Sequence, residues 1–214
     1  MDWLFDPLPR WRYRCIVVDP PWHFETQTNA GAARSPQAHY QTMTAEEIIR
    51  LPIGELAAED CLLALWATSP HLPIAMRAIQ AWGFNYAAIV PWIKTSRSGA
   101  PRQGMGYVVR GVAEPILLAT RGSLSRILAK PLLGVVMADA PTMDPDDRHA
   151  GEARVRTPAV IAQRREHSRK PDCFYPWLAD ATAGPRADIF ARAPLDGWDH
   201  WGNEAEKFEP RGGE

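Results

Sequence analysis

Residues 19–22 place a carboxylate, two prolines and an aromatic ring in one short segment, Asp19-Pro20-Pro21-Trp22. An apolar run rich in β-branched residues precedes them at 15–18 and predicts a buried strand that ends at the prolines. Open α/β sheets bind their ligands outside the carboxyl ends of the strands, so this position favours a functional site. The alternative is a Pro-Pro turn capped by an Asp, with Trp22 simply buried.

These residue types suit the alkylation of an exocyclic amine on a purine. Such an amine is a poor nucleophile, because its lone pair is delocalised into the ring. The Asp19 carboxylate and an adjacent backbone carbonyl can accept hydrogen bonds from both N–H groups and turn the lone pair toward a methyl donor. Proline has no N–H and a fixed φ, so it holds the carbonyls in place, and Trp22 can stack on a base turned out of its strand. Positioning and electrostatics would then supply most of the rate.

Strands and helices alternate around this motif. A polar loop runs from His23 to about Gln41, and Thr44 with Glu47 forms a capping box that begins a helix. The expected strands are 15–18, 61–66, 84–94, 116–119 and 187–191, and the other expected helices are 73–82 and 171–183. This alternation predicts an α/β fold with a mainly parallel sheet and helices on both faces.

The chain has 214 residues, which suits one domain, 1–214. Residues 121–167 are poorly patterned and rich in Pro, Asp and Arg, so they are expected to be an insertion or a mobile segment, with a short helix around 158–165.

Composition excludes several other classes of protein. A formal net charge of -1 argues against a globally basic nucleic-acid binder, although residues 154–170 carry six basic residues and one acidic residue. No apolar run is long enough to cross a membrane, and no signal peptide is expected. Three widely spaced cysteines fit no disulfide framework, which favours the cytoplasm. The histidine spacing predicts no metal site, and no G-x-G-x-x-G supports a dinucleotide site.

Several further motifs occur in a fixed order. They are His39-Tyr40-Gln41-Thr42-Met43, Trp92-Ile93-Lys94-Thr95, Glu114 before an apolar strand, Ser168-Arg169-Lys170-Pro171-Asp172, and Ile189-Phe190-Ala191-Arg192 followed by Trp198 and Gly202-Asn203. With these motifs and residues 19–22, the chain resembles the DPPW-type N6-adenine methyltransferases over roughly 13–204. This family includes the catalytic subunit of the eukaryotic messenger-RNA adenosine methyltransferase. The chain resembles its stand-alone bacterial and phage members.

The resemblance implies a Rossmann-like fold that uses S-adenosyl-L-methionine, with the catalytic motif before the cofactor motif in a permuted order. It implies a catalytic role for Asp19, Pro20, Pro21 and Trp22. It implies cofactor contacts for Asp19, Lys170, Asp188, Arg192, Asn203 and Glu204, with Lys170 on the methionine carboxylate. It implies substrate contacts for Tyr40, Lys94 and Glu114. The chain departs from the family where Pro194 and Leu195 replace a polar pair and where Glu204 replaces a common amide.

The expected function is therefore methylation of the N6 amine of adenine in DNA. Two alternatives stay open: the same reaction on RNA, and a catalytically inactive scaffold subunit that binds nucleic acid. The partner expected is a nucleic acid, with DNA favoured over RNA, and no membrane. The sequence leaves the oligomeric state open, a homodimer included.

Overall fold

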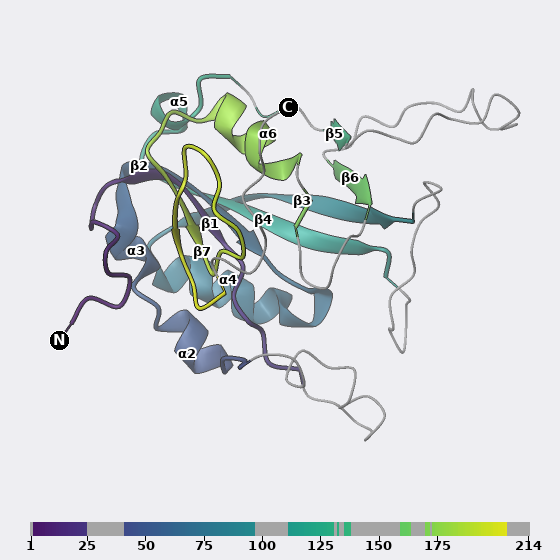
Figure 1. The fold of residues 1–214 in the computed structure, drawn as a ribbon, viewed down its shortest axis with the longest axis horizontal. Coiled ribbons are helices and arrows are strands. Elements are labelled where there is room, and N and C mark those ends of the chain that lie inside the picture. The colour runs from purple at the N-terminus through teal and green to yellow at the C-terminus, as the bar shows by residue number, and fades with distance from the viewer. Residues whose placement is uncertain are drawn as a thin grey trace, which may run out of the picture.

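The computed structural model describes residues 2–24, 41–96, 111–130, 132, 135–137, 159–163, 170–171 and 173–204. Within them, one eight-stranded sheet has the strand order β5-β6-β3-β4-β2-β1-β7-β8 (Figure 1). The strands are β1 (Tyr13–Val18), β2 (Ala57–Trp66), β3 (Asn85–Thr95), β4 (Ala113–Arg121), β5 (Val135–Met137), β6 (Ala159–Gln163), β7 (Arg186–Ile189) and β8 (Asp199–Trp201).

The sheet is mainly parallel, as predicted. Only β4 runs antiparallel to its neighbours, β2 and β3, and every other pairing is parallel. Val18 at the end of β1 lies opposite Leu65 of β2 and Ile189 of β7. The carboxyl ends of these three strands therefore meet at one edge of the sheet.

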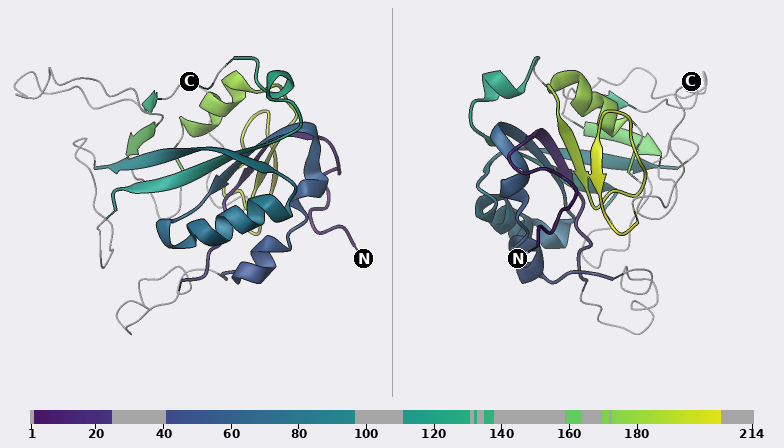
Figure 2. Two further views of the ribbon diagram at one scale, coloured as in Figure 1. Left: turned by 180° about the vertical axis from the view of Figure 1, so that it is seen from behind. Right: turned by 60° about the vertical axis from the view of Figure 1, so that its left-hand side comes forward.

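Helices cover both faces of the sheet, which confirms the expected layering (Figures 1 and 2). One face carries α2 (Ala45–Ile49), α3 (Ile53–Leu56) and α4 (Leu72–Ala81), and the other carries α5 (Leu124–Ile127) and α6 (Phe174–Ala181). Ile16 and Val18 of β1 pack into the first layer, and Cys15 and Val17 pack into the second. Because residues 15–18 of β1 are buried on both faces of the sheet, all four have to be apolar.

The start of α2 has the predicted capping box. The Thr44 hydroxyl accepts from the Glu47 backbone N–H, and the Glu47 carboxylate accepts from the Thr44 backbone N–H at 2.7 Å. Gly83 follows α4 with φ +78°, the left-handed conformation expected of a glycine that ends a helix. Among the described residues, no helix is both long enough and apolar enough to span a membrane.

The structure differs from the prediction between β4 and α6. Residues 159–163 form strand β6 rather than a helix, because Val160 and its neighbours pair with the end of β3. Strand β5 joins the sheet beside β6, and the short helix α5 follows β4. The segment 121–167 therefore contributes strands and a short helix to the fold, and its residues 131, 133–134, 138–158 and 164–167 lie outside the described part of the chain. Strand β8 was also not predicted.

Candidate active site

Asp19 directly follows β1 at the edge where the parallel strands end. Its backbone N–H donates to the Ile189 carbonyl at 3.3 Å, which extends the pairing of β1 with β7 by one residue. The Pro20 carbonyl accepts from the Trp22 N–H at 2.8 Å, and the Pro21 carbonyl accepts from the Met43 N–H at 2.8 Å. A carbonyl oxygen has two lone pairs, so that of Pro20 can accept a second hydrogen bond. Asp19 and Pro20 thus retain the two acceptors that the predicted chemistry requires.

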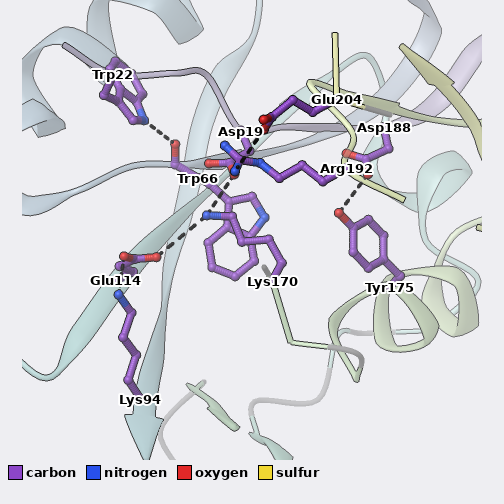
Figure 3. A network of polar contacts seen from close by, with 10 residues as sticks. All are labelled: Asp19, Trp22, Trp66, Lys94, Glu114, Lys170, Tyr175, Asp188, Arg192 and Glu204. Carbon is purple, nitrogen blue, oxygen red and sulfur yellow. Dashed lines mark hydrogen bonds and ion pairs between the residues drawn. The ribbon is translucent and has the colours of Figure 1, made fainter. Parts of the chain in front are cut away.

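Lys170 holds the Asp19 carboxylate (Figure 3). Its Nζ lies 3.0 Å from Asp19 Oδ2 and 3.8 Å from Glu114 Oε2, and 4.4 Å from the centroid of the Trp66 ring. Glu114 in turn forms an ion pair with Lys94. Cations and carboxylates therefore alternate from β3 through β4 to the end of β1, and four of the residues predicted to contact substrate or cofactor lie in one network.

The charge state of Lys170 follows from two opposing effects. Burial alone would lower the pKa of its ammonium, but the carboxylates of Asp19 and Glu114 outweigh that cost and raise the pKa above its ordinary value. Lys170 is therefore a permanent cation at neutral pH, and it cannot serve as a base.

A cavity of about 550 Å³ opens beside Asp19. It is lined by Asp19, Pro21, Gln41, Thr42, Met43, Glu47, Phe190, Ala191, Arg192, Trp201, Asn203 and Glu204. Arg192 and Glu204 form an ion pair of 3.4 Å at this wall. A Cβ on Gly202 would lie 3.0 Å from the backbone N and O of Ala191, so a larger residue would have to push the two segments slightly apart.

Asp188 lies beneath the cavity wall rather than in it. The side chain is buried in β7 and accepts a hydrogen bond of 2.8 Å from the Tyr175 hydroxyl (Figure 3). Two residues later in the chain, Phe190 has φ +66°, which is rare for a residue with a large side chain. Its ring packs edge-on against Trp201, with centroids 5.5 Å apart. This turn directs Arg192 toward the cavity.

Trp22 is buried, with 5% of its surface exposed. Its indole N–H donates to the Trp66 carbonyl at 3.1 Å, and its ring stacks on His71 with centroids 5.1 Å apart and planes at 24°. In this arrangement, the ring has no open face for a base. Tyr40, the other aromatic residue predicted to contact substrate, lies outside the described residues.

Some site residues escaped sequence reasoning. His71, Tyr175 and Trp66 contact predicted site residues, yet nothing in their local sequence distinguishes them from ordinary core side chains. Thr42 and Met43 belong to a motif that the sequence did single out, but without a role. Their place in the cavity wall depends on the bridge between residues 22 and 43, which no local pattern reveals.

Comparison with known proteins places this geometry in a family. The MT-A70 family model matches residues 13–204. The type II methyltransferase M.MunI of Mycoplasma sp is 25% identical, over 95% of this chain and 82% of that protein. The N(6)-adenine-specific methyltransferase METTL4 of Mus musculus is 29% identical, over 92% of this chain and 38% of that protein.

A fungal relative, the N6-methyladenosine RNA methyltransferase MTA1 of Cryphonectria parasitica, is 31% identical, over 91% of this chain and 52% of that protein. The chain thus spans about two-fifths to half of these two eukaryotic relatives. With a family model that extends from the first residue of β1 to the last residue of the cavity wall, this chain belongs to the MT-A70 family.

Proposed function

We propose that this protein transfers a methyl group from S-adenosyl-L-methionine to the N6 amine of adenine in DNA. The observation that carries the proposal is the Asp19 carboxylate, which lies at the carboxyl edge of the sheet, paired with Lys170 and open to the cavity. Members of the family are named adenine or adenosine methyltransferases, and this site contains the acceptors that such a reaction needs.

The cavity fits a nucleoside cofactor. Its volume falls within the range of about 300–1,000 Å³ typical of small-molecule sites. Phe190 and Trp201 offer aromatic surface for a purine. Arg192, Asn203 and Glu204 offer donors and acceptors for ribose hydroxyls, and Asp19 offers a carboxylate for a cationic amine. When bound, S-adenosyl-L-methionine supplies the methyl group on a positively charged sulfur.

Asp19 and Pro20 would orient the target amine. Each accepts one N–H of the amine, so the nitrogen lone pair points out of the plane of the base toward the methyl group. Transfer of the methyl group from the cofactor sulfur would leave the amine nitrogen with one surplus proton. That proton passes to the Asp19 carboxylate and from there to water. Lys170 remains a cation beside this carboxylate throughout, so it is not the group that takes the proton.

Lys170 lies close to Asp19, its nearest charged partner, and is not among the residues that line the cavity. Its contact with the methionine carboxylate, which the resemblance implies, stays a prediction. We therefore assign it to positioning Asp19 and balancing its charge, with Glu114 and Lys94 extending the same network of ion pairs.

RNA is the second candidate substrate, because the fungal MTA1 relative is named as an RNA methyltransferase. DNA is the first candidate substrate, because the match with the type II methyltransferase M.MunI covers 82% of that protein. An inactive scaffold is less consistent with a site in which Asp19 and Lys170 are both present and paired.

The test is transfer of labelled methyl from S-adenosyl-L-methionine to unmethylated DNA and to RNA in parallel, with the modified nucleoside identified by mass spectrometry. The proposal predicts N6-methyladenine, predominantly in DNA. A product only in RNA would correct the substrate. Absence of transfer to either polymer, together with no binding of S-adenosylhomocysteine, would refute the proposal.

A further inference from the structure

The side chain of His71 contacts the catalytic motif without belonging to it. His71 ends the short helix η2 (Ser69–His71) and is 7% exposed. Its Nε2 lies 2.8 Å from the His23 carbonyl, and its Nδ1 lies 2.7 Å from the Thr68 hydroxyl. A carbonyl oxygen only accepts, so Nε2 carries the hydrogen and donates, while Nδ1 accepts from the hydroxyl of Thr68. The neutral ring therefore has both nitrogens satisfied in one tautomer.

The same ring contacts residues 22–24, where the chain continues from the end of the catalytic motif. One face stacks on Trp22, and Phe24 meets the ring edge-on with centroids 4.6 Å apart. Between these two contacts, the His23 carbonyl accepts from Nε2. A single side chain thus fixes the position of two rings and one carbonyl in consecutive residues.

Residues 42 and 43, where the chain comes back to the site, form hydrogen bonds with the same segment. The Thr42 hydroxyl lies 2.9 Å from His23 Nδ1, and the Met43 N–H donates to the Pro21 carbonyl. Thr42, Met43 and Pro21 all line the cavity next to Asp19. The position of His23 therefore affects the cavity wall as well as the end of the catalytic motif.

We infer that His71 is a positioning residue for the proposed methyl transfer, and that Trp22 is its packing anchor rather than a stacking surface for the base. Its bond to His23 sets the position of residues 20–24 and, through His23 and Pro21, that of residues 42–43. This inference rests on the proposed function.

Two substitutions separate positioning from packing. His71→Phe keeps a flat ring against Trp22 but removes both hydrogen bonds. His71→Gln loses the ring, but its amide can still donate to the His23 carbonyl. We expect His71→Phe to lower the methyl-transfer rate by about tenfold, as the loss of one hydrogen bond at the site would. We expect His71→Gln to retain most of the rate, even if it unfolds at a lower temperature. His200→Gln, on the exposed strand β8, serves as the matched control and should retain the wild-type rate.

The inference is overturned if the rate of methyl transfer does not depend on the hydrogen bond to His23. That is the case if His71→Phe transfers methyl as fast as wild type, or if His71→Gln transfers it no faster than His71→Phe. Nitrogen NMR of histidine-labelled protein adds a measurement independent of catalysis. The signal that disappears in His71→Gln should belong to a neutral ring protonated on Nε2. An Nδ1–H ring would overturn the inference. A wild-type protein with the Nε2–H ring but without methyl transfer would count against the proposed function instead.

Discussion

Replacing Lys170 with Met should disable the site and destabilise the fold together. The substitution keeps most of the side-chain volume and removes the ammonium that lies 3.0 Å from the Asp19 carboxylate. Among the described residues, no other cation lies within ion-pair distance of Asp19. At an effective dielectric constant of about 20, the attraction between the two charges at this distance is about 5 kcal/mol. Part of this attraction offsets the cost of removing the two charged groups from water. Breaking such a pair from one side costs about 3–5 kcal/mol.

We therefore expect Lys170→Met to lower the free energy of unfolding by about 3 kcal/mol. If the same energy is lost from the transition state, methyl transfer falls by about 100-fold. Denaturant unfolding measures the first effect, and single-turnover methyl transfer at saturating cofactor measures the second.

The matched control is Lys130→Met. Lys130 also forms a close ion pair, at 2.7 Å with Asp180, but both side chains are exposed, so its loss should change neither stability nor rate appreciably. The reasoning is refuted if the Lys170 and Lys130 variants behave alike, or if Lys170→Met keeps the wild-type rate. Retained rate with lost stability would show that Lys170 supports the fold and not Asp19.

Three further outcomes follow from the geometry. Gly202→Ala places a Cβ 3.0 Å from the Ala191 backbone, so S-adenosylhomocysteine affinity measured by calorimetry should fall by about tenfold; unchanged affinity would contradict the close approach. Tyr175→Phe leaves the buried Asp188 carboxylate without its 2.8 Å donor and should lower the free energy of unfolding by about 1–3 kcal/mol, measured in denaturant. Burial keeps the folded-state pKa of His71 below its usual value of about 6.5, so the unfolded chain binds the proton first. The His71 contribution to stability is therefore complete above that pH and is lost as the pH falls toward the folded-state pKa, and His71→Gln should remove this part of the pH dependence.

The alternation of strands and helices was predictable because each signal is local. Residues 15–18 are apolar on every position, as a strand buried on both faces must be, and Thr44 with Glu47 marks a helix start within four residues. Strand β6 was not predictable in the same way. Its five residues are stabilised by pairing with β3, a partner more than 60 positions earlier in the chain, and in isolation they suit a helix as well as a strand.

The residues of the site likewise fall into those that local sequence patterns predict and those that they do not. Asp19 and Arg192 come just after two strands that pair in parallel, β1 and β7, so sheet geometry predicts that they lie near each other at one edge. The pairing of Lys170 with Asp19 and the burial of Trp22 against His71 depend on side-chain packing between distant segments. The sequence therefore indicated which charged residues gather at this edge, but the packing of Trp22 against His71 could not be predicted from it, and the roles of these residues in the reaction stay predictions.

The most direct test of the central claim is methyl transfer by Asp19→Asn with cofactor affinity measured in the same preparation. The amide has the same shape as the carboxylate, but it lacks the charge and one of the two acceptor oxygens. The account predicts that S-adenosylhomocysteine still binds, with affinity reduced by no more than about tenfold, while N6-methyladenine formation falls by at least about 1,000-fold. If Asp19→Asn forms N6-methyladenine at the wild-type rate, the account is wrong.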